Sequence, residues 1–131
     1  MNDNKNDNDN NKKLIDEAEN RRTDNPTVGI EAGFEVSLAI RRVPSGVLYP
    51  DDFGVNLYIA QEGSDNIDIA RVDTSHGYCH IDRLYLPHGH EQRKHDKGFQ
   101  TDNPEGAVKY ITEDDRWREW VRRYEKNHGL P

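Results

Sequence analysis

The sequence predicts an α+β fold in which a four-stranded antiparallel meander sheet is packed by a C-terminal helix, behind a disordered N-terminal tail. Apolar and polar residues alternate from Gly33 onward, which is the period of half-buried strands, whereas the end of the chain has apolar residues at helical spacing. Short links join the extended segments. Such links favour an antiparallel meander over crossover connections.

The first 26 residues are dominated by Asn, Asp and Lys and carry very few apolar side chains. A stretch of this composition cannot bury enough apolar surface to offset its ordering entropy. We therefore expect a disordered tail over residues 1–26 and a single α+β domain over residues 27–131. A short helix that folds on a partner is the alternative for the tail, because Leu14, Ile15 and Ala18 share one helical face.

Four segments have the pattern of strands. They cover residues 34–41, 55–59, 67–73 and 78–86, and a hairpin joins the second to the third. A helix is expected after Asn103, a good N-cap, with Pro104 at its first position. Its two apolar groups lie about a quarter-turn apart, so the helix should break or kink near residues 112–114, where Thr112 could cap the second segment.

These patterns predict one core shared by the sheet and the helix. Its expected members are Phe34, Val36, Leu38, Ile40, Val55, Leu57, Ile59, Trp117, Val121 and Tyr124.

Charge and cysteine usage exclude several classes of protein. The net charge of −7, with 33% charged residues, argues against a general affinity for nucleic acid or anionic membranes, although a local basic patch can still exist. An Asp-rich, Lys-poor surface also suits a salt-rich, halophilic cytoplasm. The single cysteine, Cys79, cannot form an internal disulfide and is expected as a buried thiol. Since no apolar run is long enough for a membrane span, we expect a cytoplasmic protein.

Five of the six histidines lie in one segment, from His76 to His95. In a strand His76 and His80 lie about 13 Å apart, which argues against a metal ion shared by these two. His80 with Asp82, or His88 with His90, are spaced closely enough to chelate. A hydrated polar strand face is the simpler interpretation, so the sequence predicts neither a metal nor another cofactor.

General acid–base chemistry needs no metal, and the same segment contains the residue types for it. His76 and His80 could accept and return the 2′-hydroxyl proton of RNA, with Asp73 orienting one ring. Arg83 or Arg93 would bind the phosphate. We therefore predict His76, His80 and Asp73 as catalytic residues, and Arg83 and Arg93 as an anion site.

The C-terminal helix suggests a different function. Residues 116–128 carry an excess of positive charge that could meet RNA or an acidic partner, although a solvated helix face is the simpler interpretation.

The pattern Asp73-x-x-His76-Gly77-x-x-His80, with the later helix Ala107–Ile111 followed by tryptophan, resembles the small TumE-type proteins of toxin–antitoxin pairs and related uncharacterised archaeal proteins. The resemblance covers about half of the chain. It implies a β-rich sheet with a C-terminal helix and a growth-inhibiting protein that pairs with a helix-turn-helix antitoxin. The long Asn/Asp tail and the histidines after Leu86 depart from that pattern.

Two functional hypotheses follow from different classes of protein. The first is a toxin-like protein that acts on RNA through its His/Asp cluster. The second is a non-enzymatic module that binds a protein partner through an exposed strand or the basic helix, whereas an antitoxin is the partner expected for the first.

Overall fold

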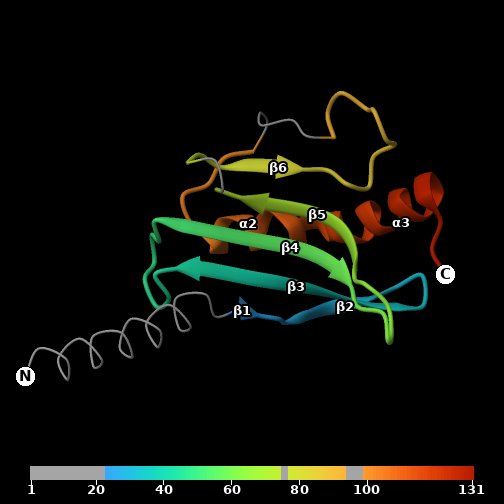
Figure 1. The fold of residues 1–131 in the computed structure, drawn as a ribbon, viewed down its shortest axis with the longest axis horizontal. Coiled ribbons are helices and arrows are strands. Elements are labelled where there is room, and N and C mark those ends of the chain that lie inside the picture. The colour runs from blue at the N-terminus through green and yellow to red at the C-terminus, as the bar shows by residue number, and fades with distance from the viewer. Residues whose placement is uncertain (1–22, 75–76, 94–98) are drawn as a thin grey trace, which may run out of the picture.

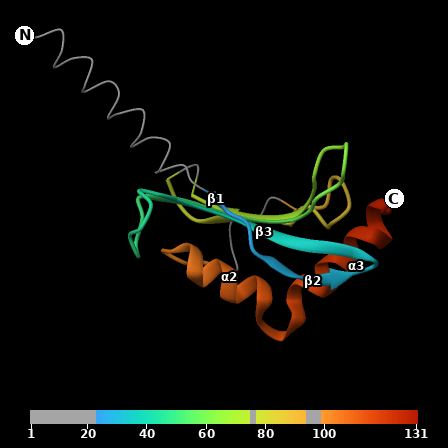
Figure 2. The same ribbon diagram turned by 90° about the horizontal axis from the view of Figure 1, so that it is seen from below.

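The computed structural model describes residues 23–74, 77–93 and 99–131. One antiparallel sheet has both helices on the same face, and the described residues place no helix on the other face (Figures 1 and 2). The predicted α+β class, with an antiparallel sheet and a C-terminal helix, is confirmed. The elements in chain order are β1 (Thr23–Asp24), β2 (Thr27–Glu31), β3 (Phe34–Val43), β4 (Asp52–Ile59), β5 (Ile67–Asp73), β6 (His80–Asp82), α2 (Pro104–Thr112), the 3-10 turn η1 (Glu113–Asp115) and α3 (Arg116–His128).

The sheet has one more position than the four predicted. Its order is β1-β3-β4-β5-β6, and β2 also pairs with β3. Because β1 and β2 follow one another along the same edge of β3, they fill a single fifth position (Figure 1). β2 contains Gly29 and a register shift, and this irregularity weakens its alternating pattern. β1 falls in the last residues of the range that the sequence assigned to the tail, whose residues 1–22 lie outside the described part.

The fourth predicted strand is much shorter than residues 78–86, because β6 contains only His80–Asp82. The backbone groups that would continue the strand are used in a loop instead. The amide of Arg83 donates to the carbonyl of Arg93 at 2.6 Å, and the amide of Leu86 donates to the carbonyl of Arg83 at 3.1 Å. Gly77, with a φ of +83°, turns the chain before β6.

The core lies between the sheet and the helices. Seven of the ten predicted core residues are buried, and the other three, Phe34, Ile40 and Tyr124, are partly buried against the same cluster. The buried seven are Val36, Leu38, Val55, Leu57, Ile59, Trp117 and Val121. The alternation of the strands therefore identified the inward face correctly.

The helical end has the predicted start and the predicted break. The side chain of Asn103 accepts a hydrogen bond from the amide of Gly106 at 2.9 Å, and Pro104 opens α2. Asp114 and Asp115 both have a φ of 54°, which separates α2 from α3. Thr112 does not cap α3, because its hydroxyl donates to the carbonyl of Val108 at 2.8 Å. Among the described helices, none has the length and apolar character needed to cross a membrane.

Candidate functional site

The face of the sheet opposite the helices is polar, and we call it the polar face. Val72 and Ile81 are buried on the helix side, so their strand neighbours belong to the polar face. The strand register aligns these neighbours in two rows. One row contains Arg41, Gly54, Asp73 and His80, and the next contains Ala39, Asn56, Arg71 and Asp82.

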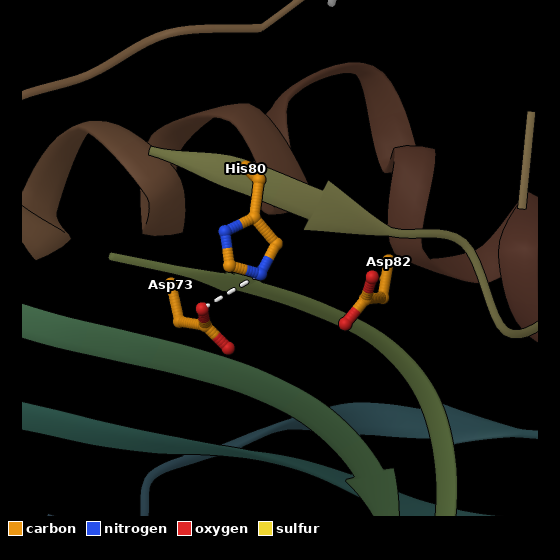
Figure 3. A group of neighbouring side chains, drawn as sticks. All are labelled: Asp73, His80 and Asp82. Carbon is orange, nitrogen blue, oxygen red and sulfur yellow. Dashed lines mark ion pairs between the residues drawn. The ribbon is translucent and has the colours of Figure 1, made fainter. Parts of the chain in front are cut away.

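Asp73, His80 and Asp82 form a compact cluster at the β6 end of these rows (Figure 3). Asp73 and His80 stand opposite each other on β5 and β6, and the Nε2 atom of His80 lies 2.9 Å from Oδ1 of Asp73. One ligand atom from each of the three side chains lies within 4.8 Å of the others. All three side chains are largely buried, with exposed fractions of 8% for His80, 13% for Asp73 and 18% for Asp82.

Two arginines extend the polar face away from the cluster. Arg71 lies opposite Asp82, with Nε 3.6 Å from Oδ2 of that carboxylate. Arg41 and Arg71 both line a shallow groove of about 340 Å³ that borders Asp73. Gly54 provides the space for this groove, because a Cβ added there would lie 3.3 Å from Nη2 of Arg41 and 3.6 Å from Cβ of Asp73.

Asp52 holds Arg41 in place at the start of β4. Nη1 of Arg41 lies 2.6 Å from Oδ2 of Asp52, and the hydroxyl of Thr74 donates to the other carboxylate oxygen. The Arg41 hydrogen bond, helped by Thr74, keeps the pKa of Asp52 below its usual value of 3.8. The carboxylate of Asp52 therefore stays charged and fixes the arginine at the rim of the groove.

The structure brings two of the predicted site residues together and places Arg83 and Arg93 in and beside the loop that follows β6. Asp73 and His80 are brought together, whereas His76 lies outside the described residues. Nη1 of Arg83 donates to the carbonyl of Gln92 at 3.4 Å, and Nε of Arg93 donates to the carbonyl of Leu86 at 3.3 Å. Both arginines thus support the loop that follows β6, and their anion-binding role stays a prediction.

The basic C-terminal helix uses much of its charge within the molecule. Glu31 of β2 lies 3.0 Å from Nη1 of Arg118 and 2.9 Å from Nε of Arg122. Hydrogen bonds from Arg122 and Arg118 lower the pKa of Glu31 below its ordinary value, against a smaller opposing effect of burial. Arg116 pairs in turn with Glu113 at 3.1 Å. These contacts leave less positive charge for a partner than the sequence count indicates.

Cys79 is buried beside β6, as the sequence predicted. Burial raises the pKa of its thiol above the ordinary value, so the sulfur stays protonated at neutral pH.

Sequence reasoning did not predict three residues of this site, namely Arg41, Arg71 and Gly54. Arg71 alternates with Asp73 on one strand, so it was in principle detectable as a neighbour on the same face. Arg41 and Gly54 enter the site only through the pairing of β3 with β4 and of β4 with β5. Such long-range register cannot be read from local periodicity.

The fold and site define a small α+β protein whose helix-covered antiparallel sheet carries a His/Asp cluster on its polar face. The chain belongs to the family described as "Domain of unknown function (DUF7718)", whose model matches residues 48–130. The matched range contains the whole cluster and starts after Arg41. No curated protein and no solved structure matches the chain. The family match gives no support to the resemblance to TumE-type toxins, which stays a hypothesis.

Proposed function

We propose that this protein cleaves RNA at the Asp73–His80–Asp82 cluster. The observation that carries the proposal is the convergence of a buried imidazole and two carboxylates beside a groove lined by Arg41 and Arg71. Carboxylate and imidazole groups can move protons, and guanidinium groups bind phosphate oxygens. Both kinds of group are needed to break a phosphodiester bond.

The reaction we propose is an internal transesterification. The 2′-oxygen attacks the adjacent phosphorus, the bond between phosphorus and the 5′-oxygen breaks, and a 2′,3′-cyclic phosphate forms. The cluster takes the 2′-hydroxyl proton and returns a proton to the departing 5′-oxygen, which leaves as a hydroxyl. Arg71 and Arg41 stabilise the negative charge on the phosphate oxygens during the transfer.

The net charge of −7 makes RNA binding depend on these local arginines. The proposal therefore predicts weak binding that falls steeply with added salt.

The test uses the full chain and a single-stranded RNA with a label at its 5′ end. We expect His80→Gln and Asp73→Asn to lower the cleavage rate by roughly 10²–10⁴-fold, the usual contribution of a positioned proton-transfer group. His90→Ala is the matched control, because His90 is an exposed histidine in the loop after β6. Circular dichroism checks that each variant is folded. Equal cleavage by all four proteins would end the proposal and indicate a contaminating nuclease.

Expression in a growing cell tests the toxin hypothesis separately. If RNA cleavage stops growth, wild type should arrest the culture, His80→Gln should not, and an antitoxin partner should relieve the arrest. Normal growth with wild type would remove the toxin hypothesis but leave RNA cleavage in vitro to stand.

A second candidate function, binding of a protein partner, is favoured by one exposed apolar loop. Val47, Leu48 and Tyr49 are 38%, 57% and 63% exposed, and they follow one another between β3 and β4. A cavity lined in part by Val47 and Leu48 shares Ile40, Arg42 and Glu105 with a second cavity. If growth arrest depends on this loop, Leu48→Ser should abolish the arrest while His80→Gln retains it.

A further inference from the structure

We infer that Asp73, His80 and Asp82 bind one divalent transition-metal ion. The inference concerns the cluster used in the proposed function, but it does not require that RNA is the substrate. It would replace the metal-free chemistry that the sequence favoured.

The orientation of His80 is the first observation. Its Nδ1 atom is buried, whereas Nε2 points to Asp73. The imidazole therefore presents one nitrogen to the two carboxylates, which is how a histidine ligand is presented to a metal ion (Figure 3). Asp82 lies on β6, the strand of His80 itself, and Asp73 lies on the paired strand β5, so the three donors converge from a rigid support.

The spacing of the donors is the second observation. Ligands at about 2.0–2.2 Å from a zinc ion lie roughly 3–3.5 Å from one another. The Asp73 and His80 donors are already 2.9 Å apart, and no pair in the cluster exceeds 4.8 Å. Small side-chain rotations of Asp82 and Asp73 would therefore close the set around an ion. The backbone need not move, because Val72 and Ile81 anchor the two strands in the core.

The charge balance points the same way. Two carboxylates with exposed fractions of only 13% and 18% converge on one imidazole, that of His80, whose Nε2 lies 2.9 Å from Oδ1 of Asp73. Arg71 approaches Asp82, but its Nε remains 3.6 Å away, and 43% of its side chain is exposed. A divalent cation between the carboxylates would compensate both of them.

The donor types select the class of ion. Two carboxylate oxygens and one imidazole nitrogen suit Zn²⁺ or Mn²⁺, whereas Mg²⁺ and Ca²⁺ prefer oxygen donors alone. Three protein ligands leave coordination positions for water, which is the arrangement of catalytic rather than structural zinc sites. A water molecule bound there would lie next to the groove that holds Arg41 and Arg71. It could lose a proton near neutral pH and serve as the base that the proposed cleavage needs.

Metal binding can be measured directly on the full chain after dialysis against EDTA. Isothermal titration with ZnCl₂ and MnCl₂ should give one site per chain, and Co²⁺ should develop visible absorption bands from its protein ligands. Asp82→Asn and Asp73→Asn should each weaken binding by at least roughly 10–100-fold, the scale on which even groups that only support a ligand act. His90→Ala, which removes an exposed histidine of the β6 loop, should leave binding unchanged.

The outcomes separate this inference from the proposed function. Absence of binding, or equal binding by wild type, Asp73→Asn and Asp82→Asn, would overturn the metal site even if RNA is cleaved. RNA cleavage that persists in EDTA would overturn the catalytic role of the metal ion. One bound ion that requires both aspartates would establish the site, even if RNA is never cleaved. Asp82→Asn is nearly isosteric, and its circular dichroism spectrum distinguishes loss of a ligand from loss of the fold.

Discussion

The indole of Trp117 lies against the backbone of Gly29. A Cβ atom added at Gly29 would fall 2.9 Å from two ring carbons of that tryptophan, a distance that real Cβ contacts essentially never show. Trp117 is only 4% exposed, and Gly29 directly follows a register shift in the pairing of β2 with β3. The glycine therefore allows the irregular edge strand to pack on the start of α3.

Gly29→Ala is expected to destabilise the protein by about 1–3 kcal/mol, the usual cost of overpacking. The added methyl group must displace either β2 or the ring, and the buried ring has little freedom to move. Urea unfolding measures the effect. Combining the change with Trp117→Leu, which removes the clashing atoms, should cost less than the sum of the single changes. Strict additivity would show that the two residues do not contact each other.

Truncating side chains along β3 to alanine should show how deeply each side chain is buried in the core. Leu38 is 1% exposed, so Leu38→Ala should cost about 2–5 kcal/mol. Ile40 is only partly buried and lines the surface cavity that includes Val47 and Leu48, so Ile40→Ala should cost less. Chemical denaturation of both variants tests this order. A larger loss at Ile40 would mean that the edge of the core is placed wrongly.

Local periodicity was sufficient for the central part of the fold and insufficient at its edges. The alternation from Phe34 to Ile40 predicted β3 and its inward face because one side is apolar over the whole strand. β2 and β1 lack such a pattern, and they form because the free edge of β3 supplies backbone hydrogen-bond partners. The sequence predicts a β6 that is longer than the observed strand, because residues beyond its end have the types that strands prefer. Tyr85 and Leu86 look like strand residues, yet they are buried in a loop.

The sequence predicts the site residues by their types, but which of them meet depends on how the strands pair. Asp73 and His80 were named from their residue types, and the strand pairing explains why they meet. The sequence spacing also makes Asp82 a residue that could chelate together with His80, two residues away on the same strand. Arg41 is far from the cluster in sequence, and only the assembled sheet places it beside Asp73. His76 lies outside the described residues, so its role stays a prediction.

Asp52 predicts a measurable dependence of stability on pH. Its folded-state pKa is lowered, chiefly by the hydrogen bond from Arg41, so its contribution is complete above the unfolded value of about 3.8 and is lost as the pH falls through the folded value. The pair is 32% and 40% exposed, which limits its contribution to about 0.2–1 kcal/mol. In Asp52→Asn and in Arg41→Met, the unfolding free energies at pH 7 and pH 3 should therefore differ less than in wild type. An unchanged difference in both variants would show that the pair is not formed in solution.

The cap of α2 gives a test of the predicted helix start. Asn103→Ala removes the side-chain acceptor of the Gly106 amide and should cost about 0.5–2 kcal/mol. Asn103→Ser keeps an acceptor and should restore most of the loss. Thermal unfolding of the two variants is the measurement. Equal stability of the alanine and serine variants would argue that the cap is unimportant in the assembled domain.

Gly54 offers a way to separate the groove from the cluster. Gly54→Val would fill the groove between Arg41 and Asp73 without replacing any of the three cluster side chains. A branched residue suits a strand, and the new Cβ would lie 3.3 Å from Nη2 of Arg41, so a shift of that guanidinium by a few tenths of an ångström should accommodate the change. If the groove holds the phosphate, the valine side chain occupies its place, and KM for RNA should rise by roughly 10-fold or more. A tenfold rise corresponds to about 1.4 kcal/mol of lost binding free energy. Affinity for Zn²⁺ should stay at the wild-type value. Wild-type kinetics in Gly54→Val would exclude the groove as the substrate site and leave the cluster to act on a ligand that approaches from another side.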